Sequence, residues 1–300
     1  MANLIALTDL SGDDLLRILD RADILADAWK RNRMPQSLKD QQVGLWFYGQ
    51  GFRNRLAFEI GARAMGASVS YIPGDLGIHE PLEDIGHYLD AWFSILVVRA
   101  RNHDDLLYLA NSMHAPVINA RTNFNHPCEI LGDLQFVRKH RGAIDGLRVV
   151  FVGEVTNLCM SWFEAAVRLP VSVTQVAPSG YIADTLLLEQ LNSRAVGEIR
   201  VSSDLDPLLQ DVDLIYTDCW PKADSGTDSQ KIQELFFPFQ ITIHHLQSLK
   251  RGALFLPCPP VTRGQEVSPD AMDSPLCLNY EAKAHLLHTQ NAVLEFVWNA

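Results

Sequence analysis

The sequence has 300 residues, of which 47% are hydrophobic and 20% charged, and its formal net charge at pH 7 is −11. This composition is typical of a folded globular protein with one large or two medium domains, and it excludes a mainly disordered chain. A net negative charge disfavours nonspecific binding to nucleic acid or to an anionic membrane. No apolar run reaches about 18 residues and no leader pattern opens the chain, so we expect a cytoplasmic protein without a membrane segment.

The cysteines give no sign of a disulfide framework or of a zinc site. They number five, their spacing is irregular and none forms a C-x-x-C pair. We therefore expect reduced thiols and no bound metal.

In chain order, the sequence predicts an opening helix from Ser11, followed by short apolar segments that alternate with helical ones. Such alternation is typical of a parallel α/β architecture. The predicted strands are Val43–Tyr48, Ser68–Ile72, Phe93–Val98, Val117–Asn119, Leu147–Val152, Val171–Val176, Leu214–Thr217 and Ala253–Leu256. The predicted helices between them are Arg53–Met65, Pro81–Asp90, Asp104–Ser112, Cys128–His140, Met160–Arg168 and Ile182–Asn192.

Two glycines, Gly142 and Gly146, flank a break in this pattern near Arg141–Gly146. We expect an N-terminal domain over residues 1–141 and a second α/β domain over residues 142–280. A last helix, within residues 281–300, is expected to pack back on the first domain.

Four segments carry side chains suited to chemistry. Gly51–Arg55 follows a predicted strand and opens a helix, so its amides and two arginines can bind an anion. Arg99 directly follows another strand, and His126 precedes a helix. Cys258 lies in a proline-rich loop at a strand end, where α/β folds bind ligands. Taken alone, these segments are also compatible with a solvated helix start, a surface arginine, a capping or packed loop histidine and a stiff loop.

Together these segments resemble the aspartate and ornithine carbamoyltransferase family, and the ornithine branch most closely. The resemblance also includes Leu56–Glu59, Gly74–Leu76, Glu80–Asp84, Pro116–Asn119, Gly146–Val150, Tyr216–Asp218 and Arg263–Val267. It implies two Rossmann-like parallel-sheet domains, the first binding carbamoyl phosphate and the second an amine acceptor. It further implies a homotrimer, two small-molecule substrates, and no metal or organic cofactor.

The resemblance assigns roles to residues of this chain. Catalytic roles fall on Arg99, His126 and Cys258; donor or phosphate binding on Arg53, Asn54, Arg55, Glu129 and Arg263; acceptor binding on Asn157, Asp218 and Lys222.

The chain also departs from the family pattern. The phosphate loop Ser-Thr-Arg-Thr-Arg is Gly51–Arg55 here, a glutamine is Glu129, the motif His-Cys-Leu-Pro is Pro257–Pro260, and an arginine of the last helix falls at Leu286. Two lost hydroxyls and an ionised Glu129 would weaken donor binding by roughly 7 kcal/mol. Protonation of Glu129, an ion pair with one of the loop arginines or a loop movement would relieve this loss.

These departures lead to three functional hypotheses. The first is a divergent transferase that carbamoylates an amine other than ornithine, because Lys222 would repel a cationic side chain. The second is an inactive family member that acts as a binding or regulatory subunit. The third is a transferase with a changed donor, in which Glu129 is a general acid or base.

Overall fold

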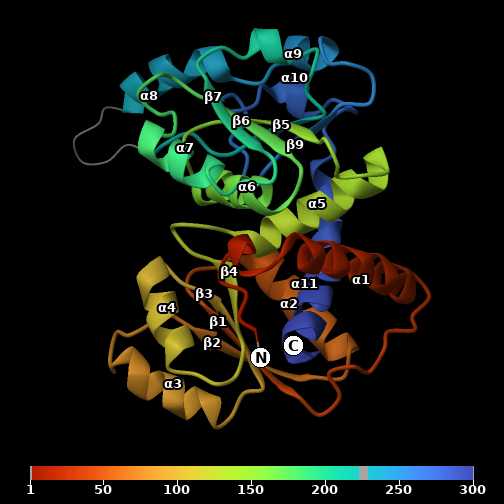
Figure 1. Ribbon diagram of the computed structural model, residues 1–300, viewed down its shortest axis with the longest axis vertical. Helices are drawn as coiled ribbons and strands as arrows, with labels where there is room; N and C mark the ends of the chain where they lie inside the picture. Colours follow the sequence, from red (N-terminus) through yellow and green to blue (C-terminus); the bar gives the residue numbers. More distant parts are fainter. Residues whose placement is uncertain (1, 223–228, 300) are drawn as a thin grey trace. The chain divides into compact units, whose positions relative to one another are not determined.

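The computed structural model describes residues 2–222 and 229–299, and the chain divides into two compact units (Figure 1). Unit 1 comprises Met1–Phe136 and Lys283–Ala300, and unit 2 comprises Val137–Ala282. Each unit is a parallel α/β domain, which confirms the predicted fold class. Among the described residues, no helix has the length and apolar character needed to cross a membrane.

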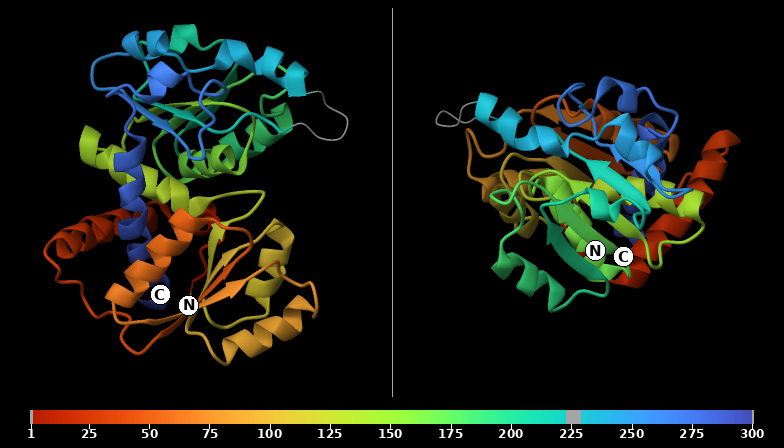
Figure 2. Two further views of the ribbon diagram at one scale, coloured as in Figure 1. Left: turned by 180° about the vertical axis from the view of Figure 1, so that it is seen from behind. Right: turned by 90° about the horizontal axis from the view of Figure 1, so that it is seen from above.

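Unit 1 is built on a parallel four-stranded sheet with the order β2-β1-β3-β4. Its strands are β1 (Gln42–Phe47), β2 (Ser68–Pro73), β3 (Ile95–Arg99) and β4 (Val117–Arg121). Its helices are α1 (Gly12–Lys30), α2 (Phe52–Ala64), α3 (Leu82–Asp90), α4 (His103–Asn111), most of α5 (Pro127–Arg141) and most of α11 (Asn279–Asn299). Helices α3 and α4 lie on one side of the sheet, and α1, α2 and α11 lie on the other (Figures 1 and 2).

The first helix begins where the sequence predicts it. The Ser11 hydroxyl accepts a hydrogen bond from the Asp14 amide at 3.1 Å, and the Asp14 carboxylate accepts one from the Ser11 amide at 3.2 Å. This capping box satisfies amides that the helix leaves unpaired. At the other end of the chain, the Glu295 carboxylate of α11 accepts a hydrogen bond from Arg21 Nη2 of α1 at 3.0 Å. The pair connects the two ends of the chain within unit 1.

Unit 2 contains a parallel five-stranded sheet with the order β7-β6-β5-β8-β9. Its strands are β5 (Arg148–Val152), β6 (Ser172–Val176), β7 (Glu198–Ser202), β8 (Leu214–Thr217) and β9 (Leu254–Pro257). Its helices are α6 (Asn157–Arg168), α7 (Thr185–Asn192), α8 (Ser229–Phe236), α9 (Ile243–Gln247) and α10 (Pro269–Met272).

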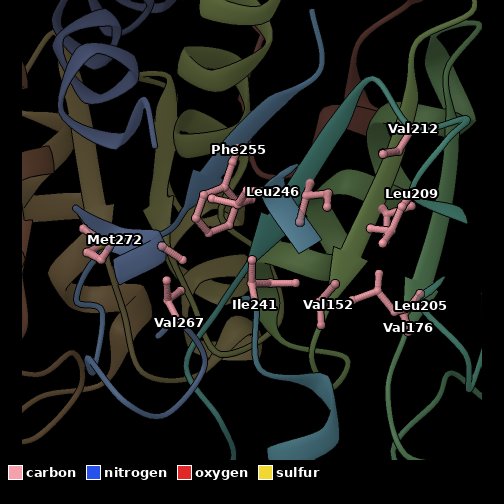
Figure 3. Close-up of a cluster of buried hydrophobic side chains, with 13 residues drawn as sticks. Val152, Val176, Leu205, Leu209, Val212, Ile241, Leu246, Phe255, Val267 and Met272 are labelled. Atoms are coloured by element: carbon pink, nitrogen blue, oxygen red, sulfur yellow. The ribbon is translucent and has the colours of Figure 1, made fainter. Parts of the chain in front are cut away.

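Strand alternation divides the apolar side chains of this sheet into two layers. Val152 and Phe255 face the layer that Leu246 of α9 and Met272 of α10 complete (Figure 3). On the opposite face, Tyr216 of β8 meets Trp162 of α6 with ring centroids 5.5 Å apart. Because both faces are covered, the central strands are apolar throughout, as the sequence indicates.

The predicted elements miss some parts of unit 2. Strand β7 is absent from the prediction because its sequence, Glu198–Ser202, alternates polar and apolar residues at the edge of the sheet. Helices α8, α9 and α10 were not predicted either, and each of them is short. Helix α6 begins at Asn157, three residues before the predicted start, because Thr156 caps it.

Candidate active site

The first turn of α2, which follows β1, brings two arginines to the carboxyl edge of the unit 1 sheet. Gly51 is the N-cap residue of α2 and has φ +40°, a left-handed conformation that favours glycine. The guanidinium of Arg53 lies 4.8 Å from the Phe52 ring, and that of Arg55 lies 4.6 Å from the Tyr71 ring. Both arginine side chains are partly exposed, so a ligand can reach them.

Asn54, which lies between these two arginines in the first turn of α2, turns inward instead. It is buried, and its Nδ2 atom donates to Glu129 Oε2 of α5 at 2.9 Å. Its Oδ1 atom accepts a hydrogen bond from Gln290 Nε2 of α11 at 2.7 Å. The side chain of Asn54 therefore anchors the loop to two helices.

Glu129 lies in a buried ionic cluster. Lys283 Nζ of α11 is 2.8 Å from Glu129 Oε1 and 2.8 Å from Asp133 Oδ1, and none of the three side chains is more than 8% exposed. Burial alone would favour the neutral acid, but the charge of Lys283 and the hydrogen bonds from Lys283 and Asn54 lower the pKa of Glu129 below its usual range. The carboxylate is therefore ionised and paired.

This geometry corrects the expectation that an ionised Glu129 weakens donor binding. The carboxylate is neutralised by Lys283, a residue to which the sequence assigned no role. An ionised carboxylate at neutral pH also holds no proton to donate, which argues against a general acid at this position.

His126 is buried beside this cluster. Its Nε2 atom lies 3.5 Å from both Glu129 Oε2 and Asn54 Nδ2. Burial lowers the pKa of His126 to about 3, and the charge of Arg99 acts in the same direction. A neutral imidazole can still donate one hydrogen bond to a carbonyl oxygen.

The position assigned to the family arginine is apolar here. Leu286 is 2% exposed and packs against Gly132 of α5. Its neighbour His285 bonds to Gln135 through Nδ1 at 3.0 Å. The cation of this helix is Lys283, one turn before Leu286.

In unit 2, the expected acceptor residues follow the strands at their carboxyl ends. Asn157 is the first residue of α6 and is buried. Asp218 follows β8, and its Oδ1 atom accepts a hydrogen bond from the Cys219 amide at 2.8 Å. Cys258 follows β9, and its amide donates to the Thr217 carbonyl of β8 at 2.8 Å. Adjacent parallel strands therefore place Asp218 and Cys258 at one edge of the sheet.

Burial is the main cause of the raised pKa values around Asp218, and the charge of Asp218 adds to them. Burial and the charge of Asp218 together raise the pKa of Cys219 to about 12. Burial also raises the pKa of Glu266, and Asp218 adds to this shift. This edge of unit 2 is thus negatively charged, and the Cys219 thiol stays protonated at neutral pH.

The two remaining predicted residues are at the surface. Arg263 Nη1 lies 2.8 Å from Asp273 Oδ1, so its charge is already paired within unit 2. Lys222 is exposed, and solvent therefore screens its charge.

Four residues near the site were not predicted from the sequence: Arg121, Tyr48, Lys283 and Asp133. Arg121 ends β4 as Arg99 ends β3, so the rule that identified Arg99 applies to it equally. Lys283 and Asp133 each look like ordinary polar residues of an amphipathic helix, and only their approach in three dimensions identifies them.

Comparisons with known proteins agree with this organisation. A model of the aspartate/ornithine carbamoyltransferase carbamoyl-phosphate-binding domain matches residues 2–139, and a model of the Asp/Orn-binding domain matches residues 145–297. The ornithine carbamoyltransferase of Methanobrevibacter smithii is 30% identical over 98% of both chains, and that of Halorhodospira halophila is 31% identical over 99% of both. The solved ornithine carbamoyltransferase of Pyrococcus furiosus is 27% identical, with a TM-score of 0.91 over 99% of this chain and 97% of its own.

These relatives contradict the expectation of an acceptor other than ornithine, because each of them is named an ornithine carbamoyltransferase. That expectation relied on the charge of Lys222, which the structure shows to be solvated. The family comprises carbamoyltransferase enzymes, as the resemblance implied. With both domain models matched along nearly its whole length, the chain belongs to the aspartate/ornithine carbamoyltransferase family.

Proposed function

We propose that this protein transfers the carbamoyl group of carbamoyl phosphate to the side-chain amine of ornithine. The observation that carries the proposal is the charge at the carboxyl edges of the two sheets. Arginines gather at this edge of unit 1, and carboxylates gather at this edge of unit 2. An anionic donor and a cationic acceptor suit these two edges respectively.

In unit 1, Arg53, Arg55 and Arg99 bind the donor. Guanidinium groups match phosphate oxygens with paired hydrogen bonds, and they stabilise the charge that grows as phosphate leaves. Neutral His126 donates to the carbonyl oxygen of the carbamoyl group, which makes its carbon more electrophilic. Asn54 and Glu129 hold the loop and the histidine in place.

In unit 2, Asp218 and Asn157 orient ornithine, and Cys258 lines the same edge. The acceptor amine must lose its ammonium proton before it can attack. Its nitrogen then bonds to the carbonyl carbon, the carbon–oxygen bond to phosphate breaks, and phosphate leaves with the electron pair. The amine loses a second proton as the new N–C bond becomes a urea linkage.

The test is formation of citrulline from carbamoyl phosphate and ornithine by the purified protein. We expect turnover in the wild type, a large rise in the KM for ornithine in Asp218→Asn and loss of activity in Arg53→Ala. Asp211→Asn removes another carboxylate of unit 2, one that is 79% exposed, and is expected to match the wild type. If the wild type forms no citrulline at saturating substrate, the proposed function is wrong.

Two exposed features support a trimer of this chain. Phe52, Leu56 and Ile60 form an apolar stripe along α2, with exposed fractions of 52%, 39% and 44%. Tyr71 on the edge strand β2 is also exposed. Light scattering should then give three times the chain mass of 33.6 kDa.

The five free cysteines fit the reducing cytoplasm, where we place the protein.

A further inference from the structure

Three adjacent strands of unit 1 place Tyr48, Arg99 and Arg121 at one edge of the sheet. Tyr48 directly follows β1, Arg99 ends β3 and Arg121 ends β4. In the parallel register, Phe47 pairs with Arg99, and Arg99 pairs with Arg121. The carboxyl ends of parallel strands point the same way, so these side chains meet above the sheet.

Tyr48 contacts both guanidinium groups. Its hydroxyl accepts a hydrogen bond from Arg121 Nη1 at 2.5 Å, and its ring centroid lies 5.3 Å from Arg99 Cζ. Within the described part of the chain, Arg99 Nε is buried and has no hydrogen-bond partner. Both arginines remain partly exposed, so the pair is accessible to a ligand.

Like charges held together in a partly buried place repel each other. Burial lowers the pKa of Arg99, and the charge of Arg121 lowers it further. The carboxylate of Glu129 raises the pKa of Arg99. This carboxylate already forms an ion pair with Lys283 and accepts a hydrogen bond from Asn54. A surplus of positive charge therefore remains, and a bound anion would relieve the repulsion.

The missing hydroxyls of the phosphate loop are linked to this cluster. A Cβ atom at Gly51 would lie 2.8 Å from Arg99 Cδ and 2.9 Å from Arg99 Nε. Such distances are too short for any side chain, so glycine is what allows Arg99 to lie against the loop. The absence of a side chain at Gly51 therefore leaves room for Arg99 in this chain.

We propose that Arg121, positioned by Tyr48, binds the donor phosphate together with Arg99 and replaces the hydrogen bonds that Gly51 and Phe52 cannot make. This inference rests on the proposed function only for the identity of the donor. The two arginines themselves require a phosphate dianion, whether free or carried on an acyl group. Arg121 is a determinant of donor binding and takes no part in bond making.

The experiment is calorimetric titration of the full-length protein with carbamoyl phosphate and, separately, with inorganic phosphate. Arg121→Leu should weaken both affinities by about 10- to 150-fold, the range expected for one hydrogen-bonded charge. Arg121→Lys keeps the positive charge but loses the paired N–H donors of the guanidinium, so its affinities should lie between those of the wild type and Arg121→Leu. Tyr48→Phe keeps the ring and frees Arg121, and it should weaken binding by about 2- to 10-fold.

Arg101 offers a matched control. Its guanidinium also lies on the Tyr48 ring, at 4.8 Å, but its side chain is 64% exposed and Nε donates to both oxygens of Asp75 at 3.0 Å. Arg101→Leu removes the same charge from the same ring and should change phosphate affinity by less than about twofold, as expected for an exposed pair.

The outcomes separate the inference from the proposed function. Arg121-dependent phosphate binding in a protein that makes no citrulline would support the inference and overturn the function. If the protein makes citrulline and Arg121→Leu leaves the KM for carbamoyl phosphate unchanged, the proposed function is supported and the inference is overturned. If Arg121→Leu and Arg101→Leu lose the same phosphate affinity, the effect is one of net charge. If Arg121→Leu lowers the melting temperature and leaves the affinity unchanged, the role of Arg121 is structural. Either result overturns the inference.

Discussion

The buried Lys283 cluster yields the strongest prediction about stability. Lys283→Met keeps the length and the apolar stem of the side chain but removes the ammonium. Glu129 and Asp133, 5% and 0% exposed, would then lose the ammonium that lies 2.8 Å from each of them. Breaking a buried ion pair by removing one partner costs about 3–5 kcal/mol. We expect unit 1 to lose stability by that amount.

Hydrogen exchange in urea measures this loss in unit 1 itself, because it reports the opening free energy of amides in residues 127–136 of α5 and 283–299 of α11 separately from those of unit 2. The matched variant is Glu129→Gln. It leaves Lys283 bonded to both oxygens of Asp133, at 2.8 and 2.9 Å, so its cost should stay near 1 kcal/mol, about that of one hydrogen bond. If Lys283→Met costs no more than Glu129→Gln, the cluster does not stabilise unit 1 and the reasoning is refuted.

Three further predictions concern local features of unit 1. Gly61→Ala places a Cβ atom 1.8 Å from Asn291 Oδ1, a fully buried side chain, and should destabilise the protein by about 1–3 kcal/mol in urea denaturation; an unchanged midpoint would mean that α2 and α11 separate easily. Thermal stability should fall as the pH drops from about 6.5 to 3, because the unfolded state protonates His126 in this range and the folded state does not. Glu129, with a lowered pKa, adds to the same fall below about 4.5, and His126→Asn should flatten the upper part of the curve. Ser11→Ala removes half of a capping box and should cost about 1 kcal/mol, measured by melting temperature, and a neutral result would contradict the cap.

The sequence predicts the fold well because the signals of this fold are local. Strands buried on both faces are apolar throughout, as Leu214–Thr217 is, and such runs can be read directly. Strand β7 has a different pattern because it lies at the sheet edge. The expected order of strand, loop and helix also places Arg53, Arg55 and Arg99 at the carboxyl edge of one sheet.

The candidate site was predicted less completely because its electrostatics depends on contacts between distant segments. Nothing near Glu129 in the sequence indicates that its charge is cancelled, since Lys283 lies 154 residues later along the chain and meets it only through the packing of α11 on α5. If Glu129 is considered without a partner, the expected loss of donor-binding free energy is large. If Lys283 is included, its charge cancels that of Glu129 and this loss is no longer expected. The sequence reasoning therefore failed because it did not identify Lys283 as the ion-pair partner of Glu129.

Two of the departures from the family motifs, those at Gly51 and Glu129, are accompanied by charges that can compensate for them. Where a serine hydroxyl is missing at Gly51, the guanidinium of Arg99 occupies the space, and Arg121 joins it through Tyr48. Where Glu129 replaces a glutamine, Lys283 supplies the opposite charge. Decay of an unused site would remove groups without replacing them, and it would leave no reason for two arginines to be held together. The altered residues therefore support the proposal that Arg99 and Arg121 bind the donor together.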